Sequence, residues 1–75
     1  MKLEEFVKLF AEQFDDTPMD VFNAKTEYRK LDEWSSLVAL SIISAVDDEM
    51  DKQLTGSELR SADTIEDLYK LLESK

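Results

Sequence analysis

Residues 34–50 read WSSLVALSIISAVDDEM, a segment that opens with a tryptophan and two serines and closes with a cluster of acids. Between these ends, apolar residues recur every three or four positions, which is helical spacing. The stripe comprises positions 37, 40, 43, 46 and 50, and positions 39, 42 and 45 widen it. This pattern predicts a helix over residues 36–50 that is buried along much of its length.

The serine pair marks the N-terminal end of this helix. A serine oxygen caps a helix by accepting a hydrogen bond from a backbone N–H group that has no partner within the helix. A helix N-terminus also attracts phosphate, because its free N–H groups and the positive end of its dipole face outward. The sequence therefore admits both a capping role and a functional role at Ser35 and Ser36.

The acids at the other end of the helix lie where they reduce its stability. Asp47, Asp48 and Glu49 meet the negative end of the dipole, at a cost of about 0.3–1 kcal/mol for each exposed group. Asp47 and Asp51 form a like-charge i,i+4 pair, and only Asp48 has an opposite partner at that spacing, Lys52. This placement indicates a role other than stability, such as contact with a basic partner.

Composition limits the possible functions. A chain of 75 residues makes one small domain, residues 1–75. The absence of cysteine and histidine excludes disulfides, Ser-His and Cys-His catalysis, and histidine metal sites. The net charge of −9, from 18 acids and 9 bases, argues against nucleic acid and anionic membranes and favours basic proteins. With no apolar run of membrane-spanning length and no signal-peptide pattern, we expect a cytoplasmic monomer without membrane insertion.

Three further segments have helical signals. Residues 2–14 carry an amphipathic pattern with a Glu4–Lys8 pair in the favourable order. Residues 55–58 and 64–67 each match a capping box, which predicts a short turn through residue 61 and a final helix. The fold class is therefore all-α, a small four-helix bundle with three main helices and one short helix.

The first connection, residues 15–34, is unusually long for so small a domain. It contains apolar anchors of its own, so we expect it to lie packed across the ends of the helices. Thr17 is expected to cap a short turn that has Pro18 at its first position. Trp34 is expected to pin the far end of the connection.

The acids and serines suggest two kinds of chemistry, calcium binding and nucleophilic catalysis. Asp47, Glu49, Asp51 and Glu58 have EF-hand-like spacing, but Lys52 stands where the sharp turn of that loop requires glycine. No metal site is therefore expected. Ser36 has no base to activate it as a nucleophile, so we expect no catalytic residues and no enzymatic activity.

The segment Trp34-Ser35-Ser36-Leu37, followed by a helix that ends in Asp47-Asp48-Glu49-Met50, resembles the acyl carrier protein family. Nearly the whole chain takes part in the resemblance. Further matches are the Phe6-Val7-Lys8 helix, the long first connection, Leu54 after the acids, and Thr64-Ile65-x-Asp67-Leu68. What the resemblance implies is an acyl-carrier-like fold and a carrier, not an enzyme.

The resemblance implies a role for individual residues. Ser36 would carry a covalent 4′-phosphopantetheine, added by a phosphopantetheinyl transferase, and its thiol would hold acyl groups during fatty acid, lipid or polyketide-type biosynthesis. Partner enzymes with basic surfaces would meet Leu37, Leu40, Asp47, Asp48 and Glu49. Acyl chains would be sheltered among apolar side chains of several helices, namely Ile42, Val46, Leu54, Ile65 and Leu68.

Three serines depart from the family pattern and keep other interpretations open. Ser35 replaces the family's aspartate and is itself a second, less favoured attachment site, while Ser41 and Ser44 replace an acid and a large apolar residue. The alternatives are an unmodified acyl-carrier-like interaction or regulatory protein, a carrier for another cargo, and an unrelated bundle that binds a cation.

Overall fold

The computed structural model describes residues 1–75 and contains helices and turns but no strand. The helices are α1 (Leu3–Ala11), α2 (Ser36–Met50), α3 (Gly56–Ser61) and α4 (Ile65–Glu73). Two 3-10 turns, η1 (Met19–Val21) and η2 (Tyr28–Lys30), lie in the first connection. The all-helical bundle with one short helix is thus confirmed. None of the four helices combines the length and the apolar character that a membrane-spanning helix requires.

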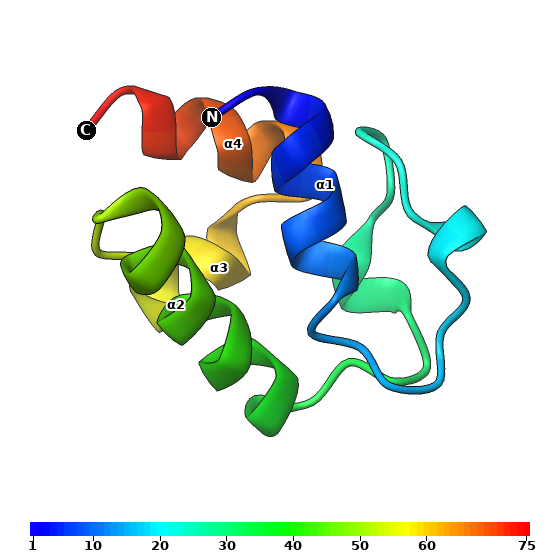
Figure 1. Ribbon diagram of the computed structural model, residues 1–75. Helices are drawn as coiled ribbons and strands as arrows, with labels where there is room; N and C mark the ends of the chain where they lie inside the picture. Colours follow the sequence, from blue (N-terminus) through cyan, green and yellow to red (C-terminus); the bar gives the residue numbers. More distant parts are fainter.

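The helices form two packed pairs. Helix α1 packs against α4, and α2 packs against α3. In Figure 1, α1 and α4 lie at the top with both termini, α2 and α3 lie below, and the first connection runs down the right-hand side. The Tyr69 hydroxyl donates to the Met1 carbonyl, which holds the N-terminus against α4.

Local capping signals explain where the helices begin. Thr55 Oγ1 accepts from the Glu58 N–H at 3.1 Å, and Thr64 Oγ1 accepts from the Asp67 N–H at 3.1 Å. The carboxylates of Glu58 and Asp67 accept in return from the N–H groups of the two threonines. Both predicted capping boxes are confirmed, and α3 and α4 each start one residue after their threonine.

Helix α1 is shorter than the predicted residues 2–14. Its last helical residue is Ala11, and the Gln13 side-chain amide donates to the Leu9 carbonyl beyond that end. This bond gives a terminal carbonyl a partner that the helix itself no longer supplies. Phe14 remains buried although it follows the helix, so the apolar pattern was read correctly but the boundary was not. The expected Glu4–Lys8 ion pair does not form; the ion pairs are Lys25–Glu66, Arg29–Asp63, Lys30–Glu27 and Lys75–Glu58.

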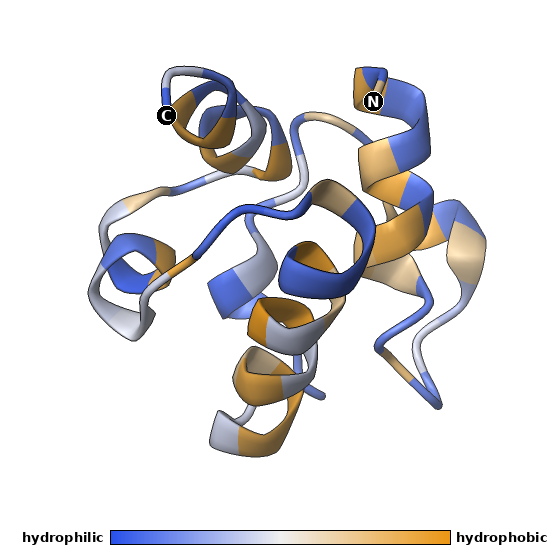
Figure 2. Ribbon diagram, turned by 60° about the vertical axis from the view of Figure 1, so that its left-hand side comes forward, coloured by the Kyte–Doolittle hydropathy of each residue, from blue (hydrophilic) through white to orange (hydrophobic).

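The buried face of α2 agrees only in part with the predicted stripe. Ile42 and Val46 are buried as expected, and the predicted positions 39, 43 and 50 pack partly against the core. Val38 is buried in addition, whereas Leu37 and Leu40 are 76% and 62% exposed. Figure 2 shows hydrophobic residues along most of the helix and hydrophilic residues gathered at its C-terminal end. A helix that is apolar nearly all round can bury any of several faces, so packing selects the one used.

The first connection is packed, as expected. Its Phe22 and Tyr28 are buried, and Trp34 is partly buried against Phe14 and Tyr28, with ring centroids 6.4 Å and 5.1 Å away. The predicted pinning role of Trp34 is therefore confirmed. The carbonyls of Ala24 and Thr26 accept from the first N–H groups of α4, so this connection also caps a distant helix.

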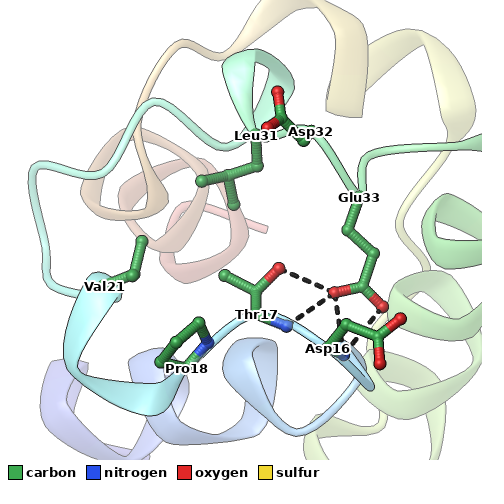
Figure 3. A pocket seen from close by; sticks show the side chains of 7 residues that line it. All are labelled: Asp16, Thr17, Pro18, Val21, Leu31, Asp32 and Glu33. Carbon is green, nitrogen blue, oxygen red and sulfur yellow. Dashed lines mark hydrogen bonds between the residues drawn. The ribbon is translucent and has the colours of Figure 1, made fainter.

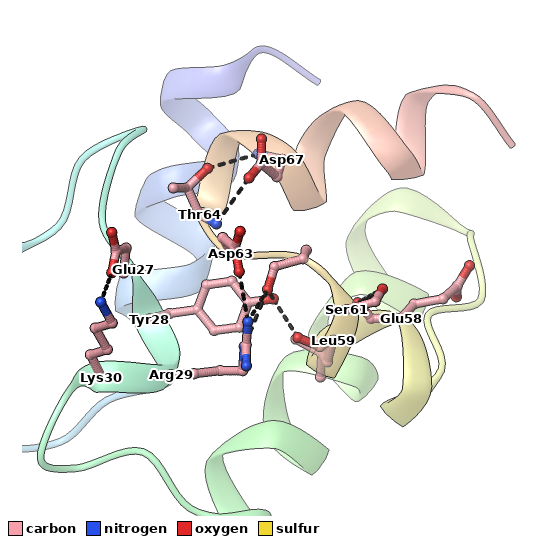
Figure 4. A network of polar contacts seen from close by, with 11 residues as sticks. Glu27, Tyr28, Arg29, Lys30, Glu58, Leu59, Ser61, Asp63, Thr64 and Asp67 are labelled. Atoms are coloured by element: carbon pink, nitrogen blue, oxygen red, sulfur yellow. Dashed lines mark hydrogen bonds and ion pairs between the residues drawn. The ribbon is translucent and has the colours of Figure 1, made fainter.

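Tyr28 joins the connection to the α3–α4 junction (Figure 4). Its buried hydroxyl donates to the Leu59 carbonyl at 2.5 Å and lies 3.1 Å from the Ala62 carbonyl. Arg29 donates to the same Ala62 carbonyl and pairs with Asp63. These bonds span more than thirty residues of sequence and satisfy the carbonyls at the end of α3.

Burial raises the pKa of Tyr28 to about 12, above its ordinary value near 10. The neutral hydroxyl thus contributes stability that is fully present below pH 10 and is lost as the pH rises toward 12. We expect the Tyr28→Phe variant to unfold with a free energy about 1–3 kcal/mol lower at neutral pH, because the Leu59 carbonyl loses its donor. The advantage of the Tyr28 protein in free energy of unfolding should fall by about 2 kcal/mol between pH 10 and pH 12. Urea denaturation of both proteins across this range measures the change, and an advantage that stays constant would contradict the prediction.

Candidate functional site

The start of α2 places the two serines in different environments. Ser35 is the N-cap residue, with extended backbone, and its Oγ accepts from the Val38 N–H at 3.3 Å. Ser36 is the first helical residue and is exposed, and its hydroxyl takes part in no hydrogen bond within the protein. The predicted capping role of the pair therefore belongs to Ser35, and Ser36 is left free.

The exposed surface beside Ser36 is apolar at first and then acidic. Leu37 and Leu40 are among the most exposed large apolar side chains of the protein. Asp47, Asp48 and Glu49 are also exposed and take part in none of the ion pairs. The helix carries no basic residue in its last turn and no acidic residue in its first. One surface of α2 therefore presents leucines near the serines and unpaired negative charge at the opposite end.

The expected Asp48–Lys52 pair does not form. Lys52 instead donates from Nζ to the Leu72 carbonyl at 2.7 Å, which ties the segment after α2 to the end of α4. Basic side chains near a helix C-terminus commonly bind its last carbonyls, and the Leu72 carbonyl also accepts from the Lys75 N–H. The acids at the end of α2 therefore have no basic side chain paired with them.

Asp51 has a structural role that the sequence reading missed. It ends α2 in the left-handed conformation, with φ 54° and ψ 40°, and its N–H donates to the Asp47 carbonyl. Aspartate tolerates this conformation better than most residues other than glycine. An aspartate directly after a helical pattern was the signal that could have identified this C-terminal cap.

The acids with EF-hand-like spacing do not converge. Glu58 accepts from Thr55 and pairs with Lys75, and Asp51 forms the C-terminal cap of α2. No group of three or more acidic side chains lies close enough to hold a metal ion.

The five apolar residues expected to shelter acyl chains are all buried in one core, namely Ile42, Val46, Leu54, Ile65 and Leu68. Beside them, a groove of about 290 Å³ lies between α2 and the segment that leads into α3. Leu40, Ile43 and Leu54 form its apolar lining, and Ser44, Asp47, Gln53 and Thr55 complete it. Of the five core residues, only Leu54 lines this groove.

Glu33 is a second residue that the sequence reading did not single out. Its carboxylate accepts from the N–H groups of Asp15, Asp16 and Thr17 and from the Thr17 hydroxyl. These donors hold the pKa of Glu33 below its usual range, the Thr17 hydroxyl contributing most. The expected cap is thus corrected: Thr17 does not cap η1, and Pro18 precedes that turn as its N-cap residue. No local pattern distinguishes Glu33 among 18 acids.

Comparisons with models of known protein families, with curated proteins and with solved structures find no match to this chain. The functional argument therefore rests on the residues and their arrangement.

The two serines provide a matched pair for a stability test. Ser35→Ala removes the capping oxygen, so we expect the free energy of unfolding to fall by about 0.5–2 kcal/mol. Ser36→Ala removes an exposed hydroxyl without a partner, and its effect should stay within about 0.5 kcal/mol. Urea denaturation of the two variants measures both values. A larger loss for Ser36→Ala than for Ser35→Ala would reverse the assignment of the cap.

Proposed function

We propose that this protein is a non-catalytic acyl carrier in which Ser36 Oγ is the attachment point of a 4′-phosphopantetheine. The observation that carries the proposal is the division between the two serines. Ser35 supplies the helix cap, so the hydroxyl of Ser36 is exposed and without a hydrogen-bond partner. A residue with no structural task at the start of the most apolar helix is well placed to be modified.

The surroundings of Ser36 suit a phosphodiester. The first turn of α2 contains no acid, and a helix N-terminus favours negative charge through its dipole and its free N–H groups. The attached group would supply a thiol that forms thioesters, and the protein, which has no cysteine, lacks any thiol of its own. Ser36 would hold the group and Ser35 would keep the helix start intact.

Two further features support a carrier rather than an enzyme. The groove at Leu40, Ile43 and Leu54 lies between α2 and the segment before α3, and its apolar lining would shelter part of an acyl chain from water. The exposed leucines and unpaired acids of α2 would meet basic patches on acyl-processing enzymes in fatty acid, lipid or polyketide-type biosynthesis.

One observation favours an alternative, an acyl-carrier-like interaction or regulatory protein that is never modified. Ser35 stands where the acyl carrier family has an aspartate that transferases meet, so the chain lacks that carboxylate. In this alternative the same leucines and acids would bind a basic partner, and Ser36 would remain a free hydroxyl.

Intact mass after incubation with coenzyme A and a phosphopantetheinyl transferase separates the two functions. We expect the protein to gain one phosphopantetheine, because Ser36 is exposed and unpartnered. Ser36→Ala should abolish the gain, and Ser35→Ala should retain it. If the protein gains no mass with the purified transferase and none with an extract of the native host, the carrier function is contradicted and the unmodified interaction protein is favoured.

The acids at the end of α2 should govern the encounter with basic partners. We expect Asp47→Asn/Asp48→Asn to lower kcat/KM of the transferase by about tenfold at low salt and to flatten its salt dependence, because steering charges are lost. Relief of the helix dipole makes this variant no less stable, so unfolding would not explain the loss.

The control variant Glu4→Gln/Asp20→Asn removes two exposed acids away from α2 and makes the same change in net charge. Its kcat/KM should equal that of the protein without substitutions at every salt concentration. Equal losses in the two double variants would show that only total charge matters.

A further inference from the structure

The carboxylate of Glu33 binds a turn that lies 16 to 18 residues earlier in the chain. The N–H groups of Asp15, Asp16 and Thr17 donate to it at 2.8, 3.1 and 2.9 Å, and the Thr17 hydroxyl donates at 2.6 Å. Figure 3 shows the bonds from Asp16 and Thr17 to Glu33, at the rim of an open cleft lined also by Pro18, Val21, Leu31 and Asp32. Bonds to an ionised acceptor are about twice as strong as neutral ones.

The bonds of Glu33 connect two parts of the bundle that otherwise pack on different partners. Helix α1 packs on α4, and α2 packs on α3. Residues 15–17 lie a few residues after the end of α1 at Ala11, and Glu33 lies three residues before Ser36. The carboxylate therefore fixes the last residues before α2 relative to the end of α1.

The next residue strengthens the same link. The Trp34 ring lies against Phe14 and Tyr28, and the Trp34 N–H donates to the Leu31 carbonyl at 3.0 Å. Ser35 then makes the cap of α2, and Ser36 follows with no polar contact of its own. The position of the Ser36 hydroxyl thus depends on residues 33–35, and Glu33 supplies most of their polar contacts.

We propose that Glu33 is a positioning residue for Ser36, and that its carboxylate, by binding the 15–17 turn, holds the start of α2 in the orientation a modifying enzyme requires. The proposal rests on the proposed function, in which Ser36 is the modified residue. Glu33 touches neither the serine nor the group to be attached. It acts through the backbone that leads into the helix.

The chemistry of the site explains why a carboxylate is needed. Four donors converge on two oxygens, and a carboxylate offers only acceptors. In Glu33→Gln, one of these oxygens becomes an NH₂ group that faces N–H groups and cannot accept from them. Asp32, the neighbouring residue, lines the same cleft and is exposed, and its carboxylate takes part in no hydrogen bond or ion pair. Asp32→Asn is therefore a matched control with the same change in charge.

The test compares Glu33→Gln, Asp32→Asn and Thr17→Val in transfer of phosphopantetheine to Ser36, below the melting temperature of each variant. We expect Glu33→Gln to lower kcat about tenfold with an unchanged KM for the carrier, because a small misplacement of a reacting group is costly while the docking surface stays intact. Thr17→Val should give a smaller loss of kcat, and Asp32→Asn should have the same kcat as the protein without substitutions. A purely stabilising role for Glu33 would lower the melting temperature without changing kcat in the folded protein.

Backbone amide exchange reports on the contact independently of modification. The N–H groups of Asp15, Asp16 and Thr17 should exchange slowly in the protein without substitutions and in Asp32→Asn, and fast in Glu33→Gln. Unchanged kcat in Glu33→Gln, or fast exchange of these amides in the protein without substitutions, would overturn the inference and leave the carrier function standing. If no transferase modifies Ser36, the carrier function fails, and with it the role of Glu33 in modification; slow exchange at residues 15–17 would then show a structural contact alone.

Discussion

The buried hydroxyl of Tyr28 holds together parts of the chain that lie far apart in sequence. Its ring contacts Phe10 of α1 and Trp34 before α2, and its oxygen donates to the end of α3. A polar group with no exposed surface must find a partner, because an unpaired buried hydroxyl costs about 1–3 kcal/mol in proteins. The first connection can pass only where that carbonyl is available, and this requirement sets its path across the helix ends.

Anchoring the connection in this way leaves α2 free to expose much of its surface. Val38, Ile42 and Val46 bury one face, Ala39, Ile43 and Met50 pack partly against the core, and Ser35 and the left-handed Asp51 cap the two ends. Its leucines and acids remain exposed. Acids near the C-terminus of a helix reduce its stability, and here no cation compensates them. A surface that costs stability and has no internal partner is consistent with binding outside the molecule.

Features that depend on neighbouring residues were predictable. The helix over residues 36–50, the capping boxes at Thr55 and Thr64 and the cap at Ser35 all follow from short-range hydrogen bonding, and the structure contains each of them. Packing of Trp34 could also be inferred, because so large an aromatic side chain in a small domain has few ways to avoid the core. The choice of Ser36 as the candidate site came instead from the resemblance to the acyl carrier protein family, because the helix start alone left Ser35 and Ser36 open.

By itself, the sequence determined that four helices form, where three of them are capped and how strongly acidic the chain is, because periodicity, capping and charge act over a few residues. Only the tertiary structure decided which face of α2 is buried, where the Lys52 side chain binds and that Glu33 joins the 15–17 turn. Helix α2 is apolar on nearly every side, so its own pattern selects no face. The other two contacts join residues 16 to 20 positions apart, whose proximity arises only when the helix pairs pack.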